Sequence, residues 1–212
     1  MKITPGIAEL VGVLIGDGYI YRKNRKYQIG IVGSPVNDNE YFEKLKELIF
    51  KEWGKEAKAK FRFRGLRMVF NSKEICSFLI NDLGLCHGKG KCFKVTIPEE
   101  IYKDWNLTKH TLRGIVDTDG SIFASKKHGI DKYPSIEITT TSSNLAIQIK
   151  EMLLKNGFKV TLREEKRKKL IGLKSYKVSL YGQKNLKKWI EEIGFTNPYK
   201  LNRALSYLKN RL

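Results

Sequence analysis

The chain has few of the residues from which disulfide frameworks and zinc sites are built. Its 212 residues include three cysteines, Cys76, Cys86 and Cys92, and three histidines. An odd number of cysteines without a Cys-x-x-Cys pair indicates neither a disulfide framework nor a structural zinc site. Cysteines of this kind are typical of a reducing compartment, so we expect an intracellular protein of the cytoplasm, the nucleoid or an organelle.

Long apolar runs are also missing. The longest run near the start, residues 10–15, is too short for the core of a signal peptide and leads directly into Asp17. No stretch approaches the roughly 20 apolar residues of a membrane span. We therefore expect neither a signal peptide nor a membrane partner.

Acidic residues are scarce, and this is the clearest signal in the composition. The 41 lysines and arginines exceed the 22 aspartates and glutamates and give a formal charge of +19. Residues 1–108 contain 19 basic and 13 acidic side chains, and the rest of the chain contains 22 and 9. A field of this sign attracts polyanions and supports binding to phosphate backbones. On charge alone, an ordinary basic protein of the ribosomal kind stays an alternative.

One segment occurs twice. Residues 10–21 recur with the same pattern as residues 112–123, each an apolar run with regularly spaced small residues that closes on Asp-Gly. Each copy brings one carboxylate, Asp17 or Asp119, to the end of a predicted helix. An Asp-Gly pair by itself can simply end a helix and begin a turn. Two copies on matching helices, in a chain this basic, favour a functional role.

The remaining pattern also repeats and predicts a duplicated αββαββα unit. The expected halves are residues 1–108 and 109–212, and residues 91–109 form the connection between the units. In the first half we expect strands at 19–22, 27–32, 58–64 and 67–71 and a helix at 73–83. In the second half we expect strands at 121–124, 135–141, 159–164 and 175–181 and helices at 144–156, 184–193 and 199–209.

Small residues line one stripe of each repeated helix. Ala8, Gly12 and Gly16 are four apart in the first copy, and Gly114 and Thr118 hold the corresponding places in the second. A glycine costs a helix about 1 kcal/mol relative to alanine, so this placement needs a reason. Close approach of two helix backbones is such a reason, and it predicts that the two helices pack side by side.

Parallel packing of these helices would place Asp17 beside Asp119. Both carboxylates would then lie at carbonyl-rich helix ends and would repel each other unless they shared a cation. Oxygen ligands of this type suit Mg²⁺, Mn²⁺ or a similar divalent cation. Such a cation can activate water and stabilise the leaving oxygen in phosphodiester hydrolysis. The repeat therefore predicts a metal-dependent nuclease.

Residues 10–18 and 112–120 resemble the two signature motifs of the LAGLIDADG homing endonucleases, in the single-chain form that acts as a monomer. The resemblance covers essentially the whole chain. It implies an α+β fold with two pseudo-twofold αββαββα halves. Their antiparallel sheets would form a saddle on double-stranded DNA, and the motif helices would pack at the centre. It also implies cleavage of both DNA strands across the minor groove.

The resemblance assigns roles to single residues as well. Asp17 and Asp119 fill the eighth motif place, whose acid binds the metal, and Gly16 and Thr118 would lend backbone carbonyls. Asp117 fills the sixth place, where the first copy has an isoleucine, so we expect a packing or capping role for Asp117 rather than a catalytic one. At the position just after the first hairpin, where the family often has a polar residue, this chain has Gly33 in one half and Thr140 in the other.

The family also tends to place a lysine after the last helix of each half. Lys89 and Lys200 are the candidates here, with Lys91 as the alternative to Lys89, and each could stabilise charge on the attacked phosphate. These lysines could equally be solvated surface residues.

Strand alternation predicts which side chains face DNA. Residues 58, 60, 62 and 64 are basic and share one face, whereas Ala59, Phe61 and Phe63 share the other, buried face. Arginine can read guanine and glutamine adenine in the major groove, while lysines contact phosphates. A face made soluble by charge is the alternative. The expected DNA contacts are Arg22, Arg25, Tyr27, Gln28, Lys58, Lys60, Arg62, Arg64, Arg67, Lys126, Lys127, Lys132, Thr161, Arg163, Lys177 and Ser179.

The leading interpretation is a Mg²⁺-dependent, site-specific endonuclease that cuts a long and only partly symmetric DNA target. The main alternative is a non-catalytic protein on the same scaffold, either a DNA-binding regulator or a maturase that binds intron RNA and assists splicing. A third is the endonuclease domain of an intein. The chain begins without Cys or Ser and ends without a His-Asn pair, so we expect a free-standing, intron-encoded protein.

Overall fold

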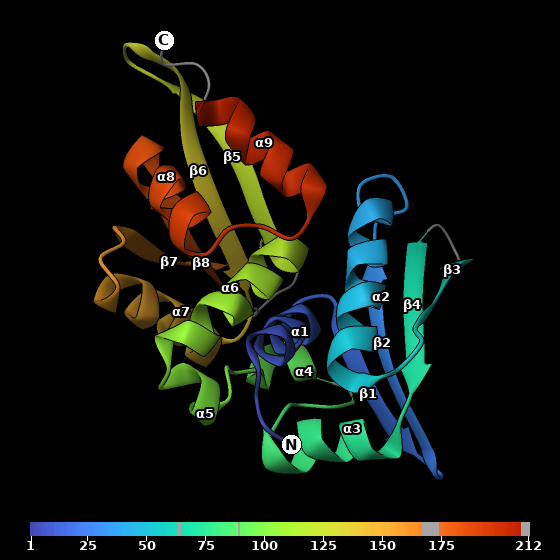
Figure 1. Ribbon diagram of the computed structural model, residues 1–212. Coiled ribbons are helices and arrows are strands. Elements are labelled where there is room, and N and C mark those ends of the chain that lie inside the picture. Colours follow the sequence, from blue (N-terminus) through green and yellow to red (C-terminus); the bar gives the residue numbers. More distant parts are fainter. Residues whose placement is uncertain (63–64, 89, 167–173, 209–212) are drawn as a thin grey trace.

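The computed structural model describes residues 1–62, 65–88, 90–166 and 174–208, and Figure 1 shows two halves built to one plan. Phe63, Arg64 and Lys89 lie outside the described residues. The first half contains α1 (Pro5–Ile15), β1 (Gly18–Lys23), β2 (Lys26–Gly33), α2 (Asn39–Trp53), β3 (Lys58–Arg62), β4 (Gly65–Asn71), α3 (Lys73–Ser77) and η1 (Phe78–Asp82). Two short helices follow, α4 (Lys91–Lys94) and α5 (Glu99–Tyr102). The second half contains α6 (Trp105–Asp119), β5 (Gly120–Lys127), β6 (Ile130–Thr140), α7 (Ser143–Lys155), β7 (Val160–Lys166), β8 (Lys174–Tyr181), α8 (Gly182–Glu192) and α9 (Pro198–Leu208).

Each half has one four-stranded antiparallel sheet. The strand orders are β1-β2-β4-β3 and β5-β6-β8-β7, so each half repeats the other's topology. The register repeats too: Gly18 pairs with Ile31, and Gly120 pairs with Ile138. The expected duplicated αββαββα architecture is therefore confirmed, and any position in one sheet has a defined equivalent in the other.

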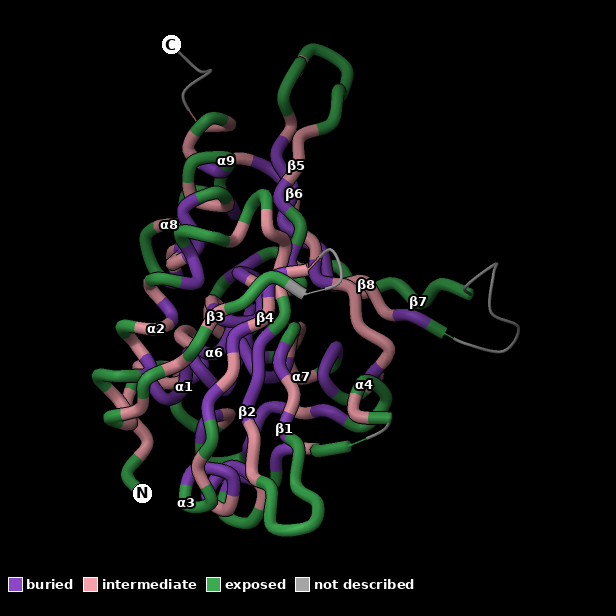
Figure 2. The backbone as a smooth tube through the Cα atoms, turned by 90° about the vertical axis from the view of Figure 1, so that its right-hand side faces the viewer, coloured by how far each residue is buried: buried purple, intermediate pink, exposed green. Residues whose placement is uncertain are grey.

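Helices α1 and α6 lie side by side at the centre, between the two sheets (Figure 1). Each begins with a side-chain cap that satisfies a free backbone N–H. The Thr4 hydroxyl accepts from the N–H of Ile7 at 3.1 Å, and the Asp104 carboxylate accepts from that of Asn106 at 2.8 Å. Buried residues concentrate along these helices and the inner strands, and one apolar core extends through both halves (Figure 2).

The connection between the halves is fixed to the second half. The Gln148 side chain of α7 accepts from the N–H of Ile97 at 2.8 Å and donates to the carbonyl of the same residue at 3.1 Å. Helix α6 begins at Trp105, so the proposed boundary between residues 108 and 109 falls inside its first turns. Among the described residues, no helix is both long and apolar enough to cross a bilayer.

The structure corrects several details of the local predictions. The basic segment 126–132 was expected to be a loop, but most of it is strand, and only residues 128–129 form the turn of a long hairpin that projects from the body (Figure 2). The predicted α-helix at 73–83 is α only to Ser77 and continues as the π-helix η1. Phe61 was expected to be buried and is 70% exposed, because it lies near the end of the edge strand β3.

Candidate active site

The two central helices approach so closely that only glycine fits at their contact. A Cβ on Gly12 would lie 2.1 Å from the carbonyl oxygen of Thr111, and one on Gly114 would lie 2.3 Å from that of Glu9. The Thr111 hydroxyl, which is fully buried, donates to the carbonyl of Ala8 at 2.8 Å. The stripe of small residues thus lies at the contact. Thr111 was not singled out from the sequence, because a threonine inside a helix has no distinctive pattern.

The contact continues to the ends of the helices and brings the two motif acids together. A Cβ on Gly16 would collide with the Thr118 hydroxyl and would lie 3.5 Å from Cγ of Asp119. The carboxyl groups of Asp17 and Asp119 lie close enough to act on each other's pKa. Two effects raise the pKa of Asp17 to about 6: partial burial of its carboxyl group, which is the larger effect, and the negative charge of Asp119. Partial burial likewise raises the pKa of Asp119. The pair is poised to gain a cation.

A lysine lies beside each helix end. The Nζ of Lys91 donates to the carbonyls of Leu14 at 2.5 Å, Gly16 at 3.1 Å and Gly18 at 2.6 Å. Burial lowers the pKa of the Lys91 ammonium, and the nearby charges of Asp119 and Asp17 oppose this shift.

Lys200 does the same for the second motif. Its Nζ donates to the carbonyls of Val116 at 2.6 Å and Thr118 at 2.7 Å. Burial also lowers the pKa of Lys200. Its positive charge acts across the interface, because it lowers the pKa of Asp17 as well as that of Asp119. The site therefore has two carboxylates between two ammonium groups.

Of the two lysines proposed for the first half, Lys91 holds the place equivalent to Lys200, and Lys89 lies outside the described residues. The sequence left both open because the spacing differs between halves. Lys91 follows Gly84 by seven residues, whereas Lys200 follows Gly194 by six. The extra residue belongs to a connection that the second half does not share.

Asp117 lies directly behind the site and is 1% exposed. Its Oδ2 accepts hydrogen bonds from the backbone N–H groups of Thr196 at 2.7 Å and Asn197 at 3.1 Å. The Asn197 side chain in turn accepts from the N–H of Tyr199 at 3.1 Å, in the first turn of α9. Burial raises the pKa of Asp117 to about 7. Asp117 thus fixes the turn that leads to Lys200.

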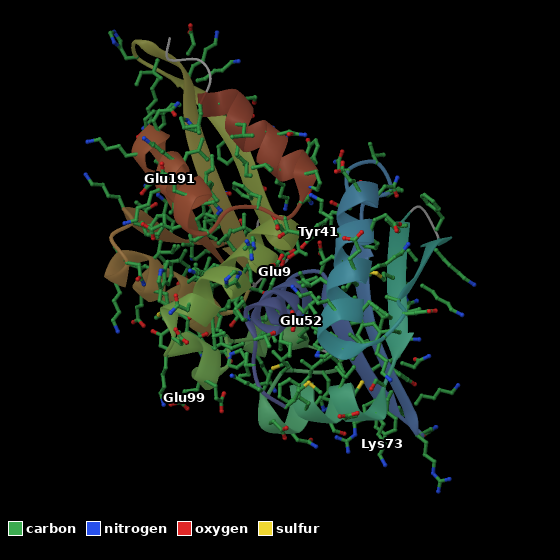
Figure 3. All side chains as sticks on the ribbon, in the orientation of Figure 1. Glu9, Tyr41, Glu52, Lys73, Glu99 and Glu191 are labelled. Atoms are coloured by element: carbon green, nitrogen blue, oxygen red, sulfur yellow. The ribbon has the colours of Figure 1, made fainter. Side chains whose placement is uncertain are left out.

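A buried polar cluster joins the halves next to Asp117. The Glu9 carboxylate of α1 accepts from Arg113 of α6 at 2.8 Å and from the Thr196 hydroxyl at 2.5 Å. Figure 3 shows Glu9 and Tyr41 on adjacent elements at the centre of the molecule. The Tyr41 hydroxyl is buried without a partner among the described residues, and burial raises its pKa. The only sequence signal for this cluster was a charged residue within each apolar motif helix.

The donor set fits a hard divalent cation. It consists of two carboxylates and the carbonyl oxygens of Gly16 and Thr118, and each of these carbonyls keeps a second lone pair beside its lysine bond. Among the described residues, no group of three or more His, Cys, Asp or Glu side chains could hold a metal. The remaining ligands would therefore have to be waters or substrate oxygens.

Gly33 and Thr140 occupy equivalent places at the ends of β2 and β6 but differ in surroundings. A Cβ on Gly33 would lie 2.7 Å from the ring of Phe42, so a side chain has no room there. Thr140 lines an open hollow that also includes Lys91 and Asp119. At this position, therefore, only the second half has a polar side chain.

We call the side of each sheet that its helices leave uncovered the outer face. It carries most of the basic and polar strand residues expected to contact DNA: Gln28, Lys58, Lys60, Arg67, Thr161, Arg163 and Lys177. Ser179 lies on the same face but is only 2% exposed, and its hydroxyl donates to Glu137, so the structure does not support a direct contact from this residue. Arg25, Lys126, Lys127 and Lys132 are exposed in the two hairpins, and Lys127 lies 3.7 Å above the ring of Tyr133. Arg62 ends β3.

Two expected contacts point away from the outer face. Arg22 donates to the side chain of Asn81 in η1 at 3.4 Å, and Tyr27 packs against the core. Both residues alternate with outer-face neighbours along their strands, and the sequence prediction counted the hairpin without separating its two sides.

Two pseudo-symmetric αββαββα halves, joined by glycine-lined helices that end in adjacent acids, define a two-motif fold. Comparison with solved structures agrees. The homing endonuclease I-DmoI in complex with DNA and Ca matches with a TM-score of 0.65 over 95% of this chain and 97% of that one, at 16% identity. The N-terminal LAGLIDADG domain of DUF199/WhiA matches with a TM-score of 0.56 over 90% and 82%, at 15% identity.

A family model described as a LAGLIDADG-like domain matches residues 108–194. Together with the fold, this match to the second half supports a LAGLIDADG protein of the single-chain kind, with both motifs in one chain.

Curated relatives are much longer than this chain. A replication factor C small subunit of Methanocaldococcus jannaschii is 32% identical over 96% of the chain, which spans 10% of that protein. One of Thermococcus kodakarensis is 31% identical over 96%, spanning 21%. A replicative DNA helicase DnaB of Nostoc sp. is 30% identical over 57% of the chain and 14% of its own length.

Proposed function

We propose that this protein is a site-specific endonuclease that hydrolyses both strands of double-stranded DNA with a divalent cation, Mg²⁺ or Mn²⁺. The observation that carries the proposal is the contact between the carboxyl groups of Asp17 and Asp119, at the end of a helix pair that only glycines allow. Two acids held this close, each with a raised pKa, are costly unless they bind a cation.

Each residue of the site has a definite part in the proposed reaction. Asp17 and Asp119, with the carbonyls of Gly16 and Thr118, would hold the cation. The bound cation would supply activation of water and stabilisation of the leaving oxygen. Lys91 and Lys200 orient the carbonyls of the helix ends and place a positive charge beside the acids. There they would stabilise negative charge that develops on the attacked phosphate.

The outer faces of the two sheets would hold the DNA. Their lysines and arginines can neutralise phosphates, and their strand ribbons have the width of the major groove. One chain carries both halves, so a monomer can engage a long target, and the halves can differ in the sequence that they read. The complex of I-DmoI with DNA and Ca supports this arrangement.

A cleavage assay tests the proposal. The full chain is incubated with Mg²⁺ and a plasmid library of randomised inserts, beside Asp17→Asn and Asp119→Asn. We expect the wild type to linearise a small subset of plasmids, and each variant to lose double-strand cutting by about a thousandfold or more, equivalent to several kcal/mol of barrier. Both variants should still bind DNA. A folded wild-type sample that cuts no sequence, or variants that cut normally, would contradict the proposal.

A non-catalytic DNA-binding protein is the second candidate. The same fold occurs in the LAGLIDADG domain of DUF199/WhiA, so the fold alone does not identify a nuclease. In that case the wild type would bind DNA without cutting it. A maturase would instead bind intron RNA and stimulate splicing, and an intron-splicing assay would reveal it.

The relatives support a third possibility about context. A homologous segment lies within longer proteins of two different names, replication factor C small subunit and DnaB. A module found inside different hosts suggests an inserted genetic element, and therefore an intein endonuclease domain. Self-splicing of a longer precursor that contains this segment would test that origin, and it is compatible with DNA cleavage.

A further inference from the structure

The two sheets place one basic residue each at the centre of the outer face, but in opposite surroundings. By the strand register, Arg67 of β4, opposite Val32, is equivalent to Lys177 of β8, opposite Thr139. Both side chains are partly buried against their sheets. What surrounds each one therefore decides which atoms the DNA would meet there.

In the first half, neutral groups surround the central basic side chain, Arg67. The Arg67 Nε donates to the Tyr19 hydroxyl at 2.8 Å, another guanidinium nitrogen donates to the Gln28 side chain at 3.3 Å, and the guanidinium lies 4.9 Å above the Tyr19 ring. None of the strand residues described in the first sheet is acidic. Lys58 and Lys60 lie on the neighbouring strand. This face keeps its positive charge and offers hydrogen-bond donors.

In the second half, two carboxylates form ion pairs with the central basic side chain, Lys177. The Nζ of Lys177 lies 3.5 Å from Oε1 of Glu137 and 3.3 Å from Oε2 of Glu165. The Ser179 hydroxyl also donates to Glu137, at 3.4 Å. Glu137 is on the inner strand β6, and its side chain is only 19% exposed. This group carries a net negative charge and offers acceptors at the centre of the face.

The carboxylate has no counterpart in the first half. The position equivalent to Glu137 is Gly30, where a Cβ would lie 2.2 Å from the ring of Tyr19. The aromatic ring therefore fills the space that the glutamate occupies in the other sheet. The difference is built into the packing of both faces.

We propose that Glu137 determines the sequence preference of the C-terminal half by accepting a hydrogen bond from the N4 amino group of a cytosine in the major groove. The inference rests on the DNA binding in the proposed function. A carboxylate on a DNA-facing surface is repelled by phosphates, so it lowers affinity for DNA in general. It becomes favourable only against a base that donates a hydrogen bond, and cytosine is the usual partner of Glu. Lys177, released from Glu137, would then turn to a phosphate.

The test is a binding-site selection from random duplexes in Ca²⁺, with the full-length wild type, Glu137→Gln and Glu164→Gln. Glu164 is the matched control. It belongs to the same sheet and forms an ion pair with Lys174 at 2.9 Å, but it alternates with the outer-face residues Arg163 and Glu165 along β7. Both variants thus remove one carboxylate from one sheet, and only one of them changes the outer face.

We expect the wild type to prefer cytosine at one position of its target by about tenfold or more. Glu137→Gln should exchange this preference for adenine, because a glutamine amide pairs with adenine, while Glu164→Gln should keep cytosine. A Glu137→Gln variant with the wild-type preference, or a wild type that selects a sequence without such a cytosine, would overturn the inference. A wild type that binds no DNA would instead contradict the proposed function itself.

Discussion

Each half brings one aspartate to the centre of the molecule, but the two halves support the neighbouring lysine differently. In the second half, Lys200 lies in the 11-residue helix α9, and Asp117 fixes the turn before it. In the first half, Lys91 begins the four-residue helix α4, next to Gly90 with a φ of +79°. The residue equivalent to Asp117 is Ile15, which is buried and apolar. Both lysines thus bond to backbone carbonyls, but only Lys200 is also held in place by a buried carboxylate.

The difference shows which part of the site the fold constrains most. Asp17 and Asp119 depend on a single shared contact between α1 and α6, so a change in one half affects both acids. The lysines and the outer faces belong to each half separately. They can diverge without disturbing the centre, and divergence of this kind suits a target whose two ends differ in sequence.

The largest effect is expected at the contact between α1 and α6, which both halves share. Gly12→Ala and Gly114→Ala should each lower the free energy of unfolding by about 3 kcal/mol, because the new methyl group would meet a backbone oxygen of the other helix at 2.1 or 2.3 Å. Urea denaturation measures the loss. Gly129→Ala is the control, since it has a positive φ but open space around it and should cost about 1 kcal/mol. Losses at the two helix positions no greater than this would show that the contact is loose.

The next effect should separate the halves. Lys91→Met and Lys200→Met should each slow cleavage of one DNA strand by about a hundredfold, because a positive charge beside the reacting phosphate is lost. Nicked circles should accumulate, and strand-specific end labels should show that the two variants leave opposite strands intact. Equal slowing of both strands by both variants would mean that the lysines serve one common centre.

A smaller effect is expected when Asp117 is replaced by isoleucine, the residue at the equivalent position of the first half. Asp117→Ile would leave the N–H groups of Thr196 and Asn197 without their acceptor, at a cost of about 1–3 kcal/mol each. We expect nicking of the strand that depends on Lys200 to slow by about tenfold, with the other strand unchanged. Asp117→Asn keeps an acceptor and should retain most of the rate. Identical rates for the two variants would show that Asp117 has no role in placing Lys200.

The smallest effect concerns the negative charge of the paired acids Asp17 and Asp119. The pKa of Asp17 is raised in the folded protein, from 3.8 to about 6, so its protonated form favours folding below pH 4. This contribution is lost as the pH rises through 6. Without divalent metal, Asp17→Asn should therefore gain stability over the wild type as the pH rises from 4 to 8. Thermal unfolding at both pH values measures this, with the exposed hairpin variant Asp131→Asn as the control, and an unchanged difference would argue against crowded acids.

Much of the fold was readable from the sequence because periodic patterns and glycines repeat. The duplication and the strand pairs followed from alternation, from Gly54 and Gly157, and from the two motifs. The extents of the hairpins were not readable. The strands of the β5–β6 hairpin continue beyond the helices, and exposed basic residues there look the same in a strand as in a loop.

The site was readable only in part. The small-residue stripe predicted that Asp17 and Asp119 meet, because helix periodicity fixes which residues share a face. Side-chain partners between distant segments could not be predicted in the same way. The bonds of Lys91, the ion pair of Glu9 with Arg113 and the two carboxylates around Lys177 depend on how the segments meet in space. No local pattern encodes them.

Calorimetric titration with Mn²⁺ shows whether Asp17 and Asp119 form one cation site, and it needs neither DNA nor turnover. It compares the wild type with Asp17→Asn and Asp119→Asn at pH 8. We expect the wild type to bind the cation and either single substitution to weaken the affinity more than tenfold, since the two acids form one site. Wild-type affinity in both variants would contradict it.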